Sequence, residues 1–192
     1  MDRRRRDRRG PLSPAIPPPR TPGHYAIAMV CLGNICRSPM ADVVLTQRVD
    51  DAGLAGRVTV SSCGTGDWHI GDPMDERAAA VLRANDFDPS AHRAQQFAPQ
   101  WLVSNDLVLA MDARNLADVR RVTAASGGHV DPDRVRLFGD YDPVEPGREV
   151  PDPYYGGPQG FEEVLAMVER TCAVLVSALQ RLPGLRDPGS DA

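Results

Sequence analysis

Lysine is absent from this sequence: all 22 of its basic residues are arginine. Cysteine is scarce, since the 192 residues contain four, with no Cys-x-x-Cys pair and no cysteine–histidine spacing of a zinc site. So few cysteines exclude a disulfide scaffold and indicate a reducing compartment, for which we expect the cytoplasm. Long apolar runs are also missing. None approaches the roughly 18 residues that a membrane span needs, so we expect no integral membrane association.

Acidic residues outnumber basic ones over most of the chain. The formal net charge is −4, but residues 1–20 contain seven arginines and two aspartates. The remaining residues therefore carry 15 arginines against 24 acidic residues. A net-acidic body argues against general nucleic-acid binding, so nucleic acid is not an expected partner.

The N-terminal segment, residues 1–23, is rich in arginine and proline and shows no apolar periodicity. Such a composition buries too little surface to offset the entropy of ordering, so we predict a disordered tail. Its charged start is not followed by the apolar stretch of a secretory signal. We expect a solvated tail, with recruitment to an acidic partner or an anionic lipid as the alternative. The folded domain is predicted over residues 24–185, with a C-terminal tail over residues 186–192.

Short apolar runs alternate with segments of helical periodicity along the predicted domain. Strands are predicted over residues 25–30, 57–62, 106–111 and 135–138. Helices are predicted over residues 38–53, 74–84, 112–124 and 161–182. We expect Ser38 to cap the first helix and Pro39 to occupy its first position. This alternation predicts an α/β fold, a four-stranded parallel sheet with helices on both faces, whose ligands bind beyond the carboxyl ends of the strands.

The seven residues from Cys31 to Arg37 connect the first predicted strand to the first predicted helix. A loop of this length can wrap an anion with its backbone N–H groups, to which the helix adds its positive end. Gly33 and Asn34 accept the left-handed backbone angles that such a turn requires. The same field favours the nucleophilic thiolate of Cys31, and the planar fork of Arg37 can bind two phosphate oxygens at once. We therefore expect phosphoryl transfer to sulfur followed by hydrolysis, with no metal and no cofactor.

This loop lies in the segment CLGNICRSPMA, which contains the Cys-x5-Arg-Ser signature of phosphatases. Four further segments follow it along the chain: SSCGTGDWHIG, HRAQQ, LVLAMD and DPYYGG. Together, and in this order, they resemble the low-molecular-weight protein tyrosine phosphatases, with a composition similar to that of actinobacterial members. The resemblance extends from about residue 24 to the closing helix. It implies an enzyme that removes phosphate from phosphotyrosine-containing proteins or peptides.

The resemblance assigns roles to individual residues. It implies that Cys31 is the nucleophile, that Arg37 binds the phosphate and that Asp152 is the general acid. The phosphate-binding loop would comprise Leu32, Gly33, Asn34, Ile35, Cys36, Arg37 and Ser38. A supporting hydrogen-bond network is implied for Asn34, Ser38, Ser62 and His92. The substrate cleft is implied to be lined by Leu32, Ile35, Trp68, Tyr154 and Tyr155. Aromatic walls of this kind suit a phenyl ring.

Four other residues are interpreted from their setting. Cys36 either packs beside the loop or, as the resemblance allows, forms a protective disulfide with the nucleophile, and both interpretations stay open. Cys63 stands where many members of the resembling family have alanine, and we expect no catalytic role for it. Asp112, at the end of a predicted strand, is expected to cap the next helix, and His69 to lie at the rim of the cleft. We expect a monomer.

Two other functions are compatible with the Cys-x5-Arg loop. Arsenate reductases share the fold, but they need further cysteines to relay a disulfide, and residues 91–130 contain none. The two tyrosines after Asp152 also favour a phosphatase over a reductase. The second alternative is a non-catalytic protein that binds phosphotyrosine or senses redox state through Cys31 and Cys36. The complete set of catalytic residue types argues against it.

Overall fold

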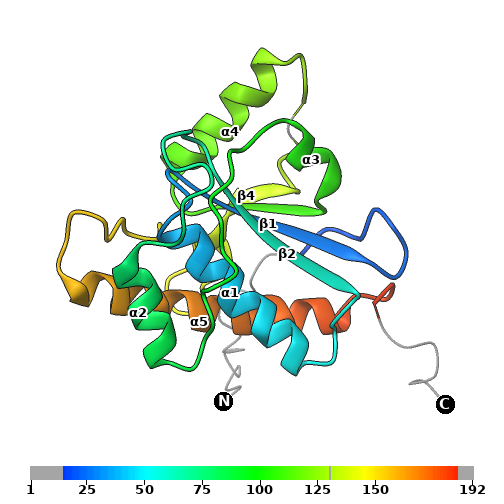
Figure 1. Cartoon of the computed structure of the whole chain (residues 1–192). Helices are drawn as coiled ribbons and strands as arrows, with labels where there is room; N and C mark the ends of the chain where they lie inside the picture. Colours follow the sequence, from blue (N-terminus) through cyan, green and yellow to red (C-terminus); the bar gives the residue numbers. More distant parts are fainter. Residues whose placement is uncertain (1–14, 130, 186–192) are drawn as a thin grey trace, which may run out of the picture.

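A computed structural model describes residues 15–129 and 131–185 of the chain. The described residues form one sheet of four parallel strands in the spatial order β2-β1-β3-β4 (Figure 1). These strands are β1 (Tyr25–Cys31), β2 (Val58–Gly64), β3 (Leu107–Ala110) and β4 (Val135–Leu137). All seven residues of the inner strand β1 are buried. The predicted four-stranded parallel sheet is confirmed.

Helices cover both faces of the sheet, as predicted (Figure 1). On one face lie α1 (Arg37–Asp51), α2 (Glu76–Ala84) and α5 (Pro158–Arg181), and on the other α3 (Gln100–Ser104) and α4 (Ala113–Ala125). The alternation of side chains along β1 explains the two layers. Ile27 and Met29 belong to the larger core cluster with α1 and α5, whereas Val30 packs in a smaller cluster with Val119 of α4.

The carboxyl ends of the strands meet at one edge of the sheet. In the parallel register Cys31 of β1 pairs with Gly64 of β2, and Val30 of β1 pairs with Ala110 of β3. The chain after the 3-10 helix η1 (Phe138–Tyr141) returns to the same edge, where the Val150 N–H donates to the carbonyl of Met111 at 2.8 Å. Loops that are distant in sequence are therefore neighbours at the edge where open α/β sheets bind their ligands.

The start of α1 differs from its prediction. The helix begins at Arg37 with Cys36 at the N-cap position, and no side chain caps it. Ser38 lies inside the first turn, and its hydroxyl donates to the Cys31 sulfur rather than capping the helix. The prediction that Ser38 caps the helix was therefore wrong. The prediction for Asp112 is confirmed, because its carboxylate accepts a hydrogen bond from the Asn115 N–H in the first turn of α4.

Residues 15–23 pack against the domain, although we predicted them as part of a disordered tail. Ile16 is buried in the larger core cluster, and the Tyr25 hydroxyl donates to the carbonyl of Pro17 at 3.1 Å. The Arg20 N–H donates to Asp106 Oδ1 at 2.6 Å, while the Ala26 N–H donates to Oδ2 of the same carboxylate at 2.8 Å. The packed structure therefore begins before residue 24. The remaining parts of the two predicted tails, residues 1–14 and 186–192, lie outside the described residues.

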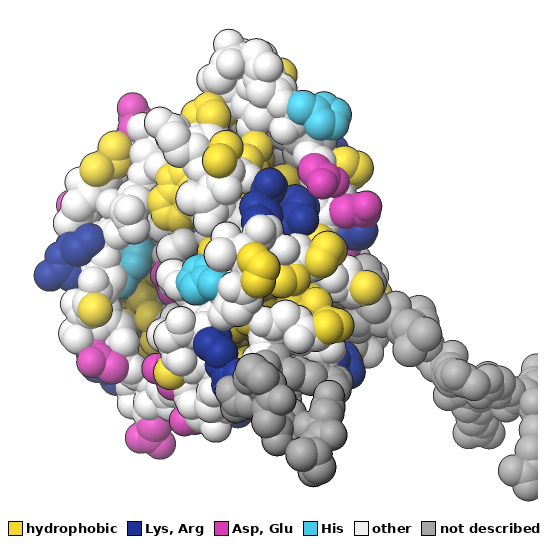
Figure 2. All heavy atoms as spheres, turned by 90° about the vertical axis from the view of Figure 1, so that its right-hand side faces the viewer, with side chains coloured by type: hydrophobic (Ala, Val, Ile, Leu, Met, Phe, Trp, Pro, Cys, Tyr) yellow, Lys and Arg dark blue, Asp and Glu magenta, His cyan; other side chains and the backbone are white. Residues whose placement is uncertain are grey.

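The surface on the side where this segment lies carries charges of both signs. Figure 2 views the molecule from the right-hand side of Figure 1, and hydrophobic side chains gather there between dispersed basic and acidic ones. Among the helices that the structure describes, none has the length and apolar character that crossing a membrane would require.

The packing of residues 15–23 predicts where the chain can be shortened. Deleting residues 1–23 removes the buried Ile16 and one partner of the buried Asp106 carboxylate, so the free energy of unfolding should fall by about 2–4 kcal/mol. Deleting residues 1–14 removes none of these contacts and serves as the control. Urea unfolding of the two shortened chains and the full chain measures the difference. Equal stability of both shortened chains would show that the segment contributes nothing.

Candidate active site

The loop between β1 and α1 is shaped by Asn34. This residue has a positive φ of 55° and a fully buried side chain. Its Nδ2 donates to the Ser38 hydroxyl at 2.9 Å, and its Oδ1 accepts from the Gln95 N–H at 2.8 Å. Its own carbonyl accepts from His92 Nε2 at 2.8 Å, so this ring nitrogen carries the hydrogen. Asn34 therefore joins the loop to α1 and to the segment after α2.

The sulfur of Cys31 receives two hydrogen bonds from this loop. The Asn34 N–H donates to Sγ at 3.2 Å and the Ser38 hydroxyl at 3.0 Å. Two hydrogen-bond donors and the N-terminus of α1 thus converge on this sulfur. Cys36, on the same loop, has a different environment: burial first, then the charges of Asp75 and Cys31, raise its pKa well above the usual range. The loop therefore surrounds one sulfur with hydrogen-bond donors and holds a second as a neutral thiol.

Arg37 is held at the end of the loop by three acceptors from two segments of the chain. Its side chain is only 4% exposed. Nη1 donates to Asp112 Oδ2 at 2.5 Å and to the carbonyl of Val150 at 3.3 Å, and Nη2 donates to Asp152 Oδ2 at 2.7 Å. The Asp112 contact was not predicted, because its position between β3 and α4 suggested only a helix cap. Asp112 therefore has a second role, which is to fix one nitrogen of the guanidinium.

Asp152 lies on the loop that precedes α5, on the opposite side of the cavity from the 65–72 loop. Its side chain is 41% exposed, and its Oδ1 accepts from the Tyr154 N–H at 3.1 Å. The predicted nucleophile, phosphate ligand and acid thus come from β1, α1 and a distant loop, and the structure brings all three together.

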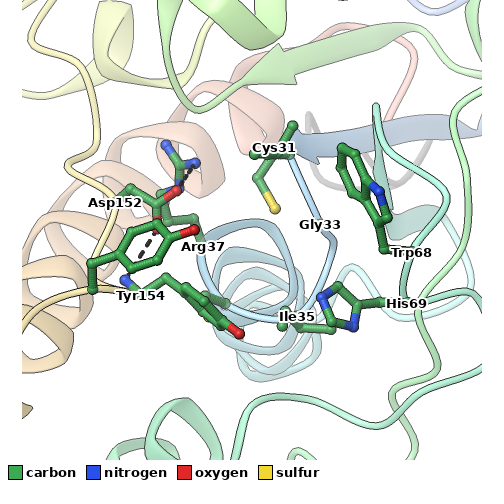
Figure 3. Close-up of a pocket in the computed structure, with 11 residues that line it drawn as sticks. Cys31, Gly33, Ile35, Arg37, Trp68, His69, Asp152 and Tyr154 are labelled. Atoms are coloured by element: carbon green, nitrogen blue, oxygen red, sulfur yellow. Dashed lines mark hydrogen bonds and ion pairs between the residues drawn. The ribbon is translucent and has the colours of Figure 1, made fainter.

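These groups surround a cavity of about 280 Å³. Figure 3 shows the sulfur of Cys31 pointing into it, with Asp152 and Tyr154 on one side and Trp68 and His69 on the other. Trp68 and Tyr155 are 70% and 94% exposed, so the entrance is aromatic. All five predicted cleft residues line the cavity, and His69 lines it as well; the full lining set is Cys31, Leu32, Gly33, Ile35, Cys36, Arg37, Trp68, His69, Asp152, Tyr154 and Tyr155.

The predicted supporting network is present except for one member. Asn34, Ser38 and His92 are linked as described above, but the Ser62 side chain is hydrogen-bonded to Asp42 instead. The carbonyl oxygen of the next residue, Cys63, lies 3.4 Å from the Ser38 hydroxyl and is the more distant of its two possible acceptors. Sequence reasoning missed Gln95, which contributes through its backbone N–H and so leaves no side-chain signal. Among the described residues, no group of three or more His, Cys, Asp or Glu side chains is arranged to hold a metal ion.

Comparison with known proteins now assigns the chain to a family. The sequence model of the low molecular weight phosphotyrosine protein phosphatases matches residues 26–183. This chain belongs to that family. A low molecular weight protein-tyrosine-phosphatase of Streptomyces coelicolor is 46% identical over 158 residues, which cover 81% of this chain and 94% of the relative. Low molecular weight protein-tyrosine phosphatase A of Mycobacterium tuberculosis is 42% identical over 163 residues, which cover 84% of this chain and 89% of the relative. The enzyme class, protein-tyrosine phosphatase, and the similarity to actinobacterial members are thereby confirmed.

Solved structures of the family share the fold. Bacillus subtilis YfkJ superposes with a TM-score of 0.75 at 33% identity, over 82% of this chain and 96% of that one. Vibrio vulnificus Wzb, solved in complex with benzylphosphonate, superposes with a TM-score of 0.67 at 25% identity, over 81% of this chain and 99% of that one.

The hydroxyl of Ser38 is expected to control the reactivity of Cys31. Replacement Ser38→Ala removes a donor to Sγ and leaves the buried Asn34 Nδ2 without its acceptor. A hydrogen bond to a charged group contributes about 1.5–3 kcal/mol, so alkylation of Cys31 by iodoacetamide at pH 6 should slow roughly 10- to 100-fold. Ser61→Ala, on the neighbouring strand, is the control. Equal alkylation rates in Ser38→Ala and the unmodified protein would contradict this role.

The stability of the loop is expected to depend on pH through His92. Burial lowers the pKa of His92 from the ordinary 6.5. Below about pH 6.5 the unfolded chain therefore binds more protons than the folded one, and stability falls as the pH drops toward the lowered pKa. The variant His92→Gln keeps a donor but does not titrate, so its unfolding free energy should fall less steeply as the pH drops. The two slopes should differ by at most about 1.4 kcal/mol per pH unit. Urea unfolding between pH 5 and pH 8 measures both slopes; parallel curves would contradict the assignment.

Proposed function

We propose that this family member hydrolyses phosphotyrosine in proteins or peptides through a phosphocysteine intermediate on Cys31. The observation that carries the proposal is the convergence of three groups on one cavity. The Cys31 sulfur lies at its base with two hydrogen-bond donors, and Arg37 and Asp152 lie against the same space from separate elements. Nucleophile, anion ligand and acid are the parts that two-step phosphoryl transfer requires.

In the first step the Cys31 thiolate attacks phosphorus, and the bond between phosphorus and the tyrosyl oxygen breaks. Backbone N–H groups of the loop and the Arg37 guanidinium balance the charge on the phosphoryl oxygens. Asp152 acts as the general acid and gives a proton to the departing tyrosyl oxygen. In the second step water attacks the phosphocysteine, Asp152 takes the proton of that water, and inorganic phosphate leaves with the thiolate restored. The two steps need no metal ion, because cationic and dipolar groups of the chain fill that role.

The cavity favours tyrosine over serine as the phosphorylated residue. Cys31 is buried at its base, and aromatic side chains stand at its entrance. A phenyl ring reaches from such an entrance to the sulfur and packs against the aromatic walls, whereas a phosphoserine is too short. The benzylphosphonate complex of Vibrio vulnificus Wzb, which pairs an aromatic ring with a phosphate-like group, supports this choice.

The setting of the enzyme is part of the same proposal. All four cysteines of the structure are free thiols, and the nucleophile must stay reduced to act. We therefore expect an enzyme that works in the reducing cytoplasm, and a monomer remains our expectation from the sequence. The open alternatives of Cys36, packing or a protective disulfide with Cys31, both fit its place in the same cavity.

The general acid can be tested through the leaving group. Asp152→Asn should lower kcat/KM for a phosphotyrosine peptide by roughly 10²- to 10⁴-fold, because tyrosyl oxygen leaves poorly without a proton. The loss should be much smaller for p-nitrophenyl phosphate, whose nitrophenolate is a weaker base. Phosphate release is measured without added metal, with a matched phosphoserine peptide and Cys31→Ser as controls.

Three results would contradict the proposal. Equal losses of kcat/KM on both substrates in Asp152→Asn would contradict the assignment of Asp152 as the acid. Phosphate release that survives in Cys31→Ser, or none from the unmodified protein under reducing conditions, would remove the phosphocysteine mechanism and leave arsenate reduction or phosphotyrosine binding.

A further inference from the structure

One arginine outside the cavity connects the loop that carries Asp152 to the phosphate-binding loop. Arg77 lies in the first turn of α2 and is absent from the residues that line the cavity. Its guanidinium contacts the 152–155 segment on one side and Asp75 on the other. The motifs that identify the catalytic groups do not include it.

On one side, Arg77 is fixed to the phosphate-binding loop through Asp75. Nε and Nη2 donate to the two carboxylate oxygens of Asp75 at 3.0 and 2.9 Å, a fork geometry that lysine cannot reproduce. The same carboxylate caps α2, and the hydrogen bonds from Arg77 lower the pKa of Asp75 against the effect of its burial. The Asp75 N–H donates to the carbonyl of Ile35 at 2.8 Å. The guanidinium thus has a fixed distance to the loop around the phosphate site.

On the other side, Arg77 holds the residue that orients the acid. Nη1 donates to the carbonyl of Tyr154 at 3.0 Å, and the guanidinium carbon lies 5.4 Å from the Tyr154 ring and 4.8 Å from the buried Phe161 ring of α5. The N–H of the same Tyr154 donates to Asp152 Oδ1 at 3.1 Å. One π contact and one hydrogen bond therefore hold Tyr154, which in turn holds the Asp152 carboxylate, while the contact with Phe161 anchors the guanidinium to α5.

We propose that Arg77 is a positioning residue for catalysis. Through its contacts with Tyr154, it sets the distance between the Asp152 carboxyl and the phosphate site. This role rests on the proposed function of Asp152 as general acid. It differs from the simpler role of a surface ion pair, which stabilises a protein by about 0–1 kcal/mol and does not distinguish between substrates. A displaced acid has a specific consequence, because proton transfer requires heavy atoms at hydrogen-bond distance.

The test compares variants on the two substrates that differ in leaving group. Arg77→Met and Arg77→Lys should each lower kcat/KM for the phosphotyrosine peptide roughly 10-fold and for p-nitrophenyl phosphate no more than about 2-fold. The inhibition constant of inorganic phosphate should stay within about 2-fold, which shows that the phosphate loop is intact. Arg83→Met removes another arginine of α2, one that pairs with Glu76 at 3.2 Å, and should leave both substrates unaffected.

A double variant separates this inference from the proposed function. If Arg77 acts through the acid, adding Arg77→Met to Asp152→Asn should cause no further selective loss on phosphotyrosine. A leaving-group effect in Asp152→Asn without one in either Arg77 variant would overturn the role of Arg77 alone. Equal losses on both substrates in the Arg77 variants would also overturn it, as would weakened phosphate inhibition. An Asp152→Asn variant that shows no leaving-group effect would overturn the assignment of the acid, and the role of Arg77 with it.

Discussion

The loop around Cys31 keeps its shape because Asn34 satisfies all its polar groups while its backbone is held in a left-handed conformation. Its N–H donates to sulfur, its carbonyl accepts from His92, and its amide side chain bridges Ser38 and Gln95. A buried amide with an unmet group would cost about 1–3 kcal/mol, and a left-handed asparagine adds strain, so the turn persists only while these partners stay in place. Loop shape, sulfur hydrogen bonding and the packing of α1 therefore depend on one residue.

The charges at the site are arranged around a single cation. Arg37 faces two carboxylates, of which Asp112 also caps α4 and is anchored by that helix, whereas Asp152 lies on a loop and is partly exposed. A phosphate dianion that enters the cavity competes with Asp152 for Nη2 and leaves the Asp112 contact undisturbed. Within the proposed mechanism, this competition releases Asp152 from Arg37 toward the leaving group. Substrate binding and preparation of the acid are then a single electrostatic event.

The sequence predicted the fold and most of the site, because strand-helix alternation and a strand–loop–helix anion site are local patterns. Errors arose where one residue type serves two purposes. Serine followed by proline is typical of a helix cap, but Ser38 gives its hydroxyl to Cys31. Asp112 does cap its helix, and nothing in its local sequence indicates the contact to Arg37, which is 75 residues away. The polar, proline-rich composition of residues 15–23 concealed the burial of Ile16, since a single apolar residue gives no periodicity.

Asp152, the proposed acid, lies on a loop that is held at one point before it and at one point after it. Before Asp152, the fully buried Asp142 carboxylate receives hydrogen bonds from both Nε and Nη2 of Arg170 on α5. Burial alone would raise the pKa of Asp142, but the hydrogen bonds from Arg170 and the backbone lower it, so the pair is ionised at neutral pH. After Asp152, Arg77 contacts Tyr154. A carboxylate between two such fixed points keeps its place beside the cavity although it lies on a loop. This arrangement reconciles a partly exposed carboxylate with the sub-ångström positioning that proton transfer needs.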